Sequence, residues 1–248
     1  MTELVHFDLI DGVATITLDS PHNRNALSRQ LLTELFDALD RAEQDSDARV
    51  VLVRSADRVF CAGADLSEAA EGGMDEGATA LVALQRRLVG HERPIVTRLA
   101  GPVRAGGLGI VASSDVVLCS DDVTFAFTES RLALAPAVIS LTVVPRLTSR
   151  AAAETFLTGR TFGAREAAAM GLVTRAVPAD ELDDAVTEVC SELKKAHPQG
   201  LRETKALLAR DLLTRIDSQA EEMAALSARL FGSDEAREAM TTFLNQRK

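Results

Sequence analysis

Apolar and polar residues along the chain follow two rhythms, one typical of strands and one typical of helices. Residues 4–10 and 13–18 are short β-rich runs on either side of Asp11-Gly12, a pair that strongly favours a hairpin turn. From residue 31 to residue 42 the apolar positions recur at helical spacing. The chain is therefore predicted to begin with a β-hairpin that is followed by an amphipathic helix.

Strands and helices keep alternating singly as far as about residue 149. Apolar runs predict further strands at 50–53, 95–99, 115–119 and 123–127. The segments between them predict helices at about 75–91 and from the glycine-bearing segment after residue 100 to about residue 114. Because single strands alternate with helices, we expect an α/β protein wound as a parallel, right-handed coil.

After about residue 149 helical patterns dominate, apart from a short apolar run at 172–177. Three amphipathic segments follow His197-Pro198, at about 199–214, 217–231 and 234–245. We therefore expect a core over residues 1–195 and a C-terminal helical region over 196–248. A terminal helical region of this kind commonly packs on a neighbouring subunit.

Composition narrows the choice of function. With 248 residues, 46% of them hydrophobic, the chain can bury one substantial core. Its formal net charge of −10 argues against a nucleic-acid partner, which would favour a basic face. The N-terminus lacks the pattern of a signal peptide, and the apolar stretches are too short to span a membrane, so we expect a cytoplasmic protein.

Metal and disulfide chemistry have little support in the sequence. The three cysteines are odd in number and lack paired spacing, which disfavours a disulfide framework or a zinc site and suits a reducing compartment. The four histidines are scattered, and no pair has ligand spacing. Cys61 has no evident histidine partner, so packing is favoured over a nucleophilic role. We therefore expect no metal and no bound cofactor.

Residues 107–112 formally match the glycine fingerprint of a dinucleotide site, Gly-x-Gly-x-x-Ala. The match lies in mid-chain, no nucleotide-binding second half follows, and no Lys-Ser/Thr pair makes it a P-loop. Glycines before a helix can instead expose unpaired N–H groups, which would stabilise negative charge developing on a thioester oxygen. Close packing of helix and strand is the simpler alternative.

Two other segments have a simple and a functional interpretation. The loop at 61–66 follows a strand end, where α/β proteins place ligand sites, but its simpler interpretation is an ordinary turn in which Asp65 caps the next helix. Glu129 follows another strand, where a glutamate is usually a solvated cap or an ion-pair partner. Taken alone, the residues favour the simple interpretation of both segments.

A resemblance to a known family favours the functional interpretation. The segments PHNRNALS (21–28), FCAGADLSE (60–68), PIVTRLAGPVRAGGLGIVASSD (94–115), FAFTESRLALAP (125–136) and FLTGRTFGAREAAAMGLVTRAVP (156–178) stand in the order and spacing of the crotonase family, which includes enoyl-CoA hydratases and isomerases. The chain resembles that family over essentially its whole length. The resemblance implies a β-β-α spiral with a C-terminal helical trimerisation region, usually assembled as a homotrimer or a dimer of trimers.

The resemblance also implies roles for individual residues. The backbone amides of Ala64 and Gly106 correspond to the family's oxyanion hole, and Glu129 corresponds to one of its two catalytic carboxylates. The substrate would be an acyl-CoA thioester. The positions that correspond to CoA contacts, some of them made to a neighbouring subunit, are Arg24, Ala26, Ala62, Asp65, Leu66, Phe243 and Lys248.

The chain departs from the family at one catalytic position. Typical enoyl-CoA hydratases carry their first carboxylate where this chain has Gly109, twenty residues before Glu129. The segment FTESRLALAPAVIS is similar to the methylglutaconyl-CoA hydratase branch, which favours hydration of an α,β-unsaturated acyl-CoA. An isomerase that moves a 3-enoyl double bond to position 2 with Glu129 alone is the main alternative. Decarboxylase or thioester-hydrolase chemistry, and a CoA binder without catalysis, are also open.

Overall fold

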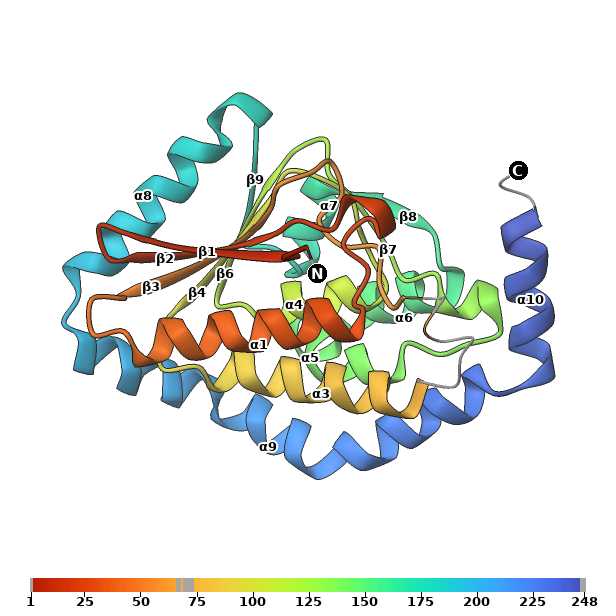
Figure 1. The fold of residues 1–248 in the computed structure, drawn as a ribbon. Helices are drawn as coiled ribbons and strands as arrows, with labels where there is room; N and C mark the ends of the chain where they lie inside the picture. The colour runs from red at the N-terminus through yellow and green to blue at the C-terminus, as the bar shows by residue number, and fades with distance from the viewer. Residues whose placement is uncertain (1, 66–67, 69–73, 246–248) are drawn as a thin grey trace.

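The computed structural model describes residues 2–65, 68 and 74–245. Figure 1 shows a twisted sheet with α1, α3 and α9 in successive layers on one side and α8 at the opposite side. Six of the described strands form this larger sheet, in the order β1-β2-β3-β4-β6-β9. β1 and β2 pair in antiparallel fashion, and every other pair in this sheet is parallel. The α/β class expected from the alternation is confirmed.

The described strands agree with the apolar runs that predict them. The strands of the larger sheet are β1 (Val5–Ile10), β2 (Val13–Leu18), β3 (Val50–Ser55), β4 (Ile95–Leu99), β6 (Val116–Ser120) and β9 (Arg175–Val177). A smaller sheet contains β5 (Val103–Arg104), β7 (Thr124–Ala126) and β8 (Thr161–Gly163). The hairpin turn is where the sequence predicts it, with Asp11 and Gly12 both at positive φ, 48° and 75°.

Helices connect the strands and cover both faces of the larger sheet. The described α-helices are α1 (Arg29–Gln44), α3 (Met74–Gly90), α4 (Gly106–Ser113), α5 (Ala137–Arg146), α6 (Ser149–Thr158), α7 (Ala164–Met170), α8 (Leu182–Lys195), α9 (Pro198–Phe231) and α10 (Asp234–Asn245). The described residues also form three short 3-10 helices, η1 (Pro21–Asn23), η2 (Glu129–Leu132) and η3 (Ala179–Glu181).

One expectation about the helices is wrong in detail, and the apolar run at 172–177 is a strand only in part. The segments expected at 199–214 and 217–231 form one continuous helix, α9, of 34 residues, since no glycine or proline separates them. In the run at 172–177, only Arg175–Val177 is a strand. The stretch before it is a helix end and turn, in which Gly171 caps α7 at φ 92°.

Apolar residues from the alternating strands pack in two layers. One cluster lies between the sheet and the helices α1, α3, α4 and α5, and includes Ile16, Val51 and Leu84. The other lies under α8, where Val186 and Cys190 pack against strand residues such as Val50. Each fully buried aliphatic side chain of this kind stabilises the fold by about 1.5–3 kcal/mol. The sheet is thus a rigid support for the loops at its edge.

The C-terminal helical region begins with α9, whose first half packs against the core. α9 packs on α3 and α5, and its side chain Lys205 is buried. The Lys205 ammonium donates to Asp115 Oδ2 at 2.7 Å and to the carbonyl oxygens of Leu88 and Arg93. Burial lowers the pKa of Lys205, and the charge of Asp115 opposes that shift. A paired charge therefore anchors the first half of α9 to the core.

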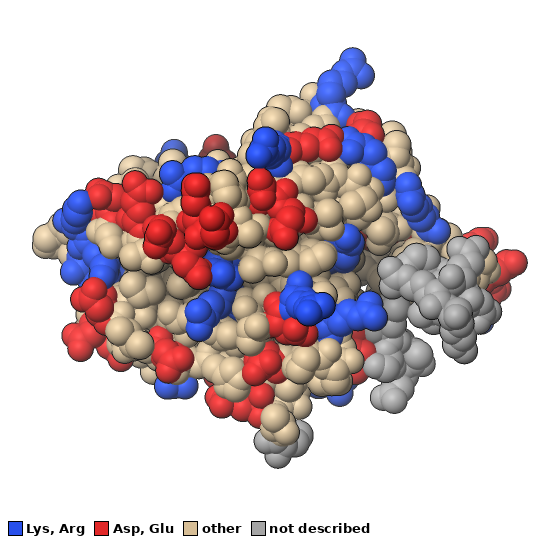
Figure 2. Space-filling model, turned by 90° about the horizontal axis from the view of Figure 1, so that it is seen from above, with Lys and Arg blue, Asp and Glu red and all other residues tan. Residues whose placement is uncertain are grey.

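The surface is mixed in charge. Figure 2 shows acidic and basic side chains interspersed over the face seen from above. No described helix combines the length and the apolar character that crossing a membrane requires.

Candidate active site

The first turn of α4 offers a free backbone amide. Ala105 caps the helix with a positive φ of 45°, and Gly106 is the first helical residue. Amides in the first turn have no acceptor within a helix, and Gly106 N donates to no other described residue. A Cβ atom at Gly106 would lie 3.0 Å from Leu27 Cδ1, so a side chain there would be crowded.

A second amide comes from the loop that follows β3. Gly63 has a φ of 101°, which glycine adopts readily and other residues rarely do. This turn directs the Gly63 carbonyl to the amide of Leu27 at 2.8 Å and leaves Ala64 N without a described acceptor. A Cβ placed on Gly106 would be 3.7 Å from Ala64 N, so the two amides lie close together.

Side chains of the preceding loop fix this arrangement. Asn23 Nδ2 donates to Asp65 Oδ2 at 2.8 Å, and Ser20 Oγ donates to Asn23 Oδ1 at 2.7 Å. The side chain of Asn25, itself at positive φ, bonds the amide of Ser20 and the carbonyl of Val59. The segments at 20–28 and 59–65, which the sequence singles out separately, are therefore one hydrogen-bonded unit.

Both amides face a cavity of about 520 Å³. Most of the residues implied by the family resemblance line it, namely Arg24, Ala26, Ala62, Ala64, Asp65, Gly106 and Glu129. Leu66 and Lys248 lie outside the described residues, and so does the side chain of Phe243, whose backbone belongs to α10. The loops and η2 thus bring seven predicted positions together.

Glu129 is the buried acid of this cavity. It begins η2, three residues after the end of β7, and is only 9% exposed. Its Oε2 atom is buried and has no hydrogen-bond partner among the described residues. Burial raises the pKa of Glu129 to about 7, although its own backbone amide donates to the carboxylate and acts in the opposite direction. A carboxyl group with such a pKa can both accept and donate a proton near neutral pH.

The other described carboxylates that line the cavity hold the loops. Asp65 accepts from Asn23, and Glu68 Oε2 accepts from the amide of Arg29 at 2.9 Å. Glu129 is therefore the described carboxylate of the cavity that is left for proton transfer.

Gly109 does not face the cavity. It is buried in the second turn of α4 and is absent from the cavity lining. A Cβ there would lie 3.2 Å from Ile139 Cγ2 and 3.3 Å from Gln85 Cδ. The space that a carboxylate side chain would need is therefore filled. These contacts suit the packing interpretation of the glycines at this position, and the assignment of Gly109 to the catalytic positions stays a prediction.

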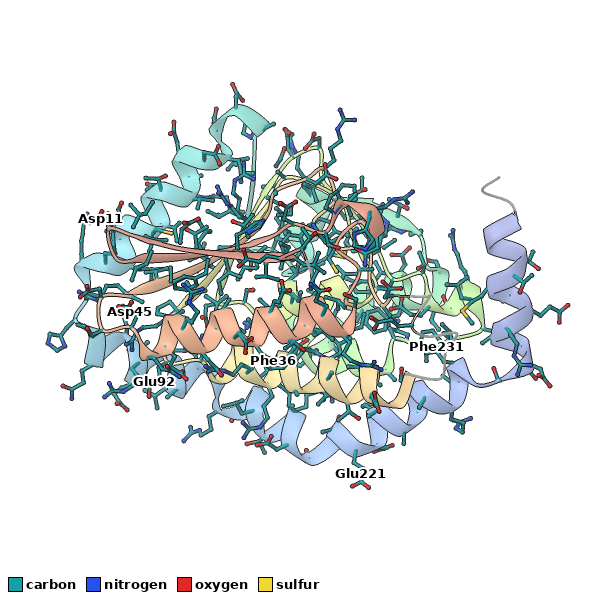
Figure 3. All side chains as sticks on the ribbon, viewed as in Figure 1. Asp11, Phe36, Asp45, Glu92, Glu221 and Phe231 are labelled. Carbon is teal, nitrogen blue, oxygen red and sulfur yellow. The ribbon has the colours of Figure 1, made fainter. Side chains whose placement is uncertain are left out.

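Sequence reasoning placed the stretch after Pro136 at the acyl pocket, but it missed the parts of this apolar end that come from α3, α9 and α10. Leu81 of α3 and Val138 and Ile139 of α5 line it, together with Phe231 at the end of α9 and Met240 of α10. Figure 3 shows Phe231 where α9 ends beside the body of the molecule. The helical periodicity marks apolar stripes on these helices, but it does not show that they meet around one cavity.

Nucleophilic and metal chemistry find no support here. Cys61 is fully buried, burial raises the pKa of its thiol to about 12, and it does not line the cavity. In the part of the chain that the structure describes, no group of three or more His, Cys, Asp or Glu residues could hold a metal ion. The amides of Ala64 and Gly106 and the Glu129 Oε2 atom are groups of this cavity that have no hydrogen-bond partner among the described residues.

Comparison with known proteins agrees with this geometry. The family model described as enoyl-CoA hydratase/isomerase matches residues 9–248. A crystal structure of an enoyl-CoA hydratase from Mycobacterium avium is 42% identical, with a TM-score of 0.92 over 99% of this chain and 98% of that one.

Curated relatives span several reactions. A 4-chlorobenzoyl coenzyme A dehalogenase from Arthrobacter sp. is 36% identical over 77% of this chain and 73% of its own. A peroxisomal Δ(3,5)-Δ(2,4)-dienoyl-CoA isomerase from Arabidopsis thaliana is 26% identical over 99% and 95%. The similarity therefore establishes a family whose members differ in the reaction that they catalyse.

Proposed function

We propose that this chain, which belongs to the enoyl-CoA hydratase/isomerase family, adds water to an α,β-unsaturated acyl-CoA with Glu129 as its single acid–base group. The observation that carries the proposal is that Glu129 shares one cavity with two free amides. Its buried Oε2 lacks a described partner, and its pKa is raised to about 7. The apolar end of the cavity suits an acyl chain.

The two amides would bind the thioester oxygen. As a nucleophile adds to the β-carbon, negative charge moves to that oxygen, and the amides of Ala64 and Gly106 stabilise it. Backbone donors at the start of α4 also benefit from the positive end of the helix dipole. The thioester alone would serve as substrate, without a metal or a bound cofactor. The mouth of the cavity near Arg24, Ala62 and Asp65 would hold the CoA moiety.

Glu129 would act twice. As a carboxylate it removes a proton from water, and the oxygen forms a bond to the β-carbon while the π electrons pass to the thioester oxygen. The resulting enolate then reforms its carbonyl, and its α-carbon takes the proton from the Glu129 carboxylic acid. One molecule of water is thereby added, and Glu129 returns to its ionised form, ready for another turnover.

Isomerisation is the second candidate, and the filled space above Gly109 favours it. Moving a double bond from position 3 to position 2 needs only one base, which removes a proton from carbon 2 and returns it to carbon 4. Glu129 meets that need without a second carboxylate. Hydration with one carboxylate asks more of the site, because the same group must activate water.

An isotope experiment decides between them. Matched 2-enoyl-CoA and 3-enoyl-CoA substrates are incubated in H₂¹⁸O and followed by mass spectrometry. A hydratase converts the 2-enoyl substrate to a hydroxyacyl product that carries ¹⁸O. An isomerase interconverts the two substrates without ¹⁸O. Failure to convert any member of an enoyl-CoA panel, with CoA still bound, would support the non-catalytic binder.

The assembly, which the family resemblance implies, and the location, which the N-terminal sequence and the cysteines favour, are further proposals. We propose a homotrimer or a dimer of trimers in the cytoplasm. Leu207 and Leu208 on α9 are 68% and 80% exposed, and Leu157 at the end of α6 is 78% exposed, so apolar surface is available for contact. Light scattering at micromolar concentration should report three or six chains, and a monomer would refute the proposal.

A further inference from the structure

We propose that Gln85 is a positioning residue, whose carboxamide ties α3 to α5 and so holds the acyl wall of the cavity beside the helix of the oxyanion amide. This inference rests on the proposed function, because it concerns how that site holds an acyl group. It starts from one observation, which is that the space above Gly109 contains a polar side chain. Gln85 is fully buried, in the middle of α3.

Every polar atom of this carboxamide has a partner. Gln85 Nε2 donates to the carbonyl oxygen of Val138 at 3.2 Å and to that of Leu81 at 3.4 Å. Gln85 Oε1 accepts from Thr142 Oγ1 at 2.6 Å, and Thr142 is also fully buried. A buried amide is costly unless it is satisfied in this way. Its bonds therefore define one preferred position for the side chain.

Two of the three partners of Gln85 belong to the cavity wall. Leu81 and Val138, which supply the two carbonyls, both line the cavity, and so does Ile139 beside Val138. Leu81 Cδ2 would lie 3.3 Å from a Cβ on Gly106, so this wall reaches the oxyanion amide. Hydrogen bonds from one side chain thus join α3 and α5 where both face the acyl end.

Gly109 makes this arrangement possible. Without a side chain at position 109, α4 approaches both helices closely enough for Gln85 Oε1 to lie 3.4 Å from the place of a Cβ. Typical enoyl-CoA hydratases carry a carboxylate at the position of Gly109, whereas this chain has no side chain there. The carboxamide of Gln85 occupies the space and holds α5 at the cavity wall. Loss of these bonds should let Val138 and Ile139 shift, and with them the acyl group relative to Glu129.

Three variants test this inference. Gln85→Leu removes both donors and the acceptor at similar volume, and Thr142→Val removes the hydroxyl alone. Thr142→Ser keeps the hydroxyl and is the matched control. For each variant the measurements are the melting temperature, kcat and KM on the best enoyl-CoA, and the Kd values of CoA, butyryl-CoA and isovaleryl-CoA. The two saturated thioesters bind without reacting at a double bond.

The expected result separates positioning from stability. Gln85→Leu and Thr142→Val should leave the Kd of CoA unchanged and alter the preference between the two acyl groups. They should lower kcat by about tenfold or more, since a displacement of about 1 Å can cost up to about 10²-fold. Thr142→Ser should restore wild-type values. The double variant should lose less than the product of the single losses, because both remove one interaction.

Other outcomes overturn the inference. If Gln85→Leu and Thr142→Val only lower the melting temperature, while kcat and the acyl preference stay as in the wild type, Gln85 is merely structural. If Gln85→Leu does not fold, the Thr142 pair decides by the same criteria. Failure of the proposed function is distinguishable, because a wild-type protein without turnover still yields the three Kd values.

Discussion

Glu129 and Gln85 are both polar, both buried and both close to the cavity, yet their surroundings differ. Gln85 has all its polar atoms bonded, whereas Glu129 keeps a buried oxygen without a described partner. An unsatisfied buried polar atom costs about 1–3 kcal/mol, so such a group persists where its reactivity is used. The difference agrees with the proposed roles, in which Glu129 transfers protons and Gln85 positions the wall beside it.

The largest expected effect comes from Glu129→Gln. The amide has nearly the same shape but cannot act as a base, so turnover should fall by at least about 10²-fold, the low end for general acid–base catalysis. Activity is measured on the best substrate of an enoyl-CoA panel. Glu203→Gln, an exposed position on α9 away from the cavity, is the control and should behave as wild type. Full activity of Glu129→Gln would show that the reacting group is elsewhere.

Gly106→Pro should lower the activity slightly less than Glu129→Gln does. Proline is tolerated at the first position of a helix, but it removes the amide that we assign to the oxyanion hole. The loss of one such donor lowers kcat by about 10²–10³-fold. Gly106→Ala keeps the amide and adds only the crowding against Leu27, so it measures the steric part. Equal activities of the two variants would contradict the role of this amide.

The raised pKa of Glu129 predicts a pH dependence of stability. Burial holds the proton more tightly in the folded protein, with a pKa of about 7 against 4.5 for the ordinary group. Stability from this residue is therefore highest below about pH 4.5 and falls as pH rises to about 7, by on the order of 3 kcal/mol. Denaturant unfolding of wild type and Glu129→Gln should show the wild type losing stability relative to the variant across that range. A constant difference between them would refute the raised pKa.

The same ionisation predicts the activity profile. Glu129 must be ionised to accept a proton, so kcat/KM should rise with pH through about 7. The profile is measured with saturating and with limiting substrate, so that the free enzyme and the complex are separated. A rate that is independent of pH between 5 and 8 would argue for a group other than this carboxyl.

Gly109→Ala tests the packing around Gln85, and we expect it to have the smallest effect. The added methyl group would lie 3.2–3.3 Å from Ile139 and Gln85, and overpacking of this kind costs about 1–3 kcal/mol. Gly200→Ala in the first turn of α9 meets no atom within 4 Å, so it should be neutral or slightly stabilising. Chemical denaturation compares the two. Equal stabilities would mean that the space above Gly109 is not filled.

Much of the fold follows from the sequence, because its signals are local. The hairpin at Asp11-Gly12 and the alternating strands depend on turn chemistry and on apolar spacing within a few residues. Ala64, Gly106 and Glu129 were identified by resemblance, and they do line one cavity. The spacing of residues alone does not bring these three positions together.

Gln85 could not be found in the same way. In the sequence it precedes two arginines on a helix, where a glutamine ordinarily faces solvent. Its burial depends on Gly109 and Thr142, which are distant along the chain and meet it only after three helices have packed. The sequence also did not show that the segments at 199–214 and 217–231 form one helix, because the apolar pattern of an exposed helix is weaker.

The length of α9 has a consequence for local unfolding. At about 1.5 Å per residue its 34 residues extend about 50 Å from Pro198 to Phe231, with the Lys205 anchor near its start and Phe231 at the cavity. Its described buried residues, Lys205, Ala209 and Ile216, all lie in the first two thirds. Amide hydrogen exchange should therefore be slowest near Lys205 and faster toward Phe231 and α10. The acyl end of the cavity can then open by fraying while the sheet and the oxyanion amides stay folded.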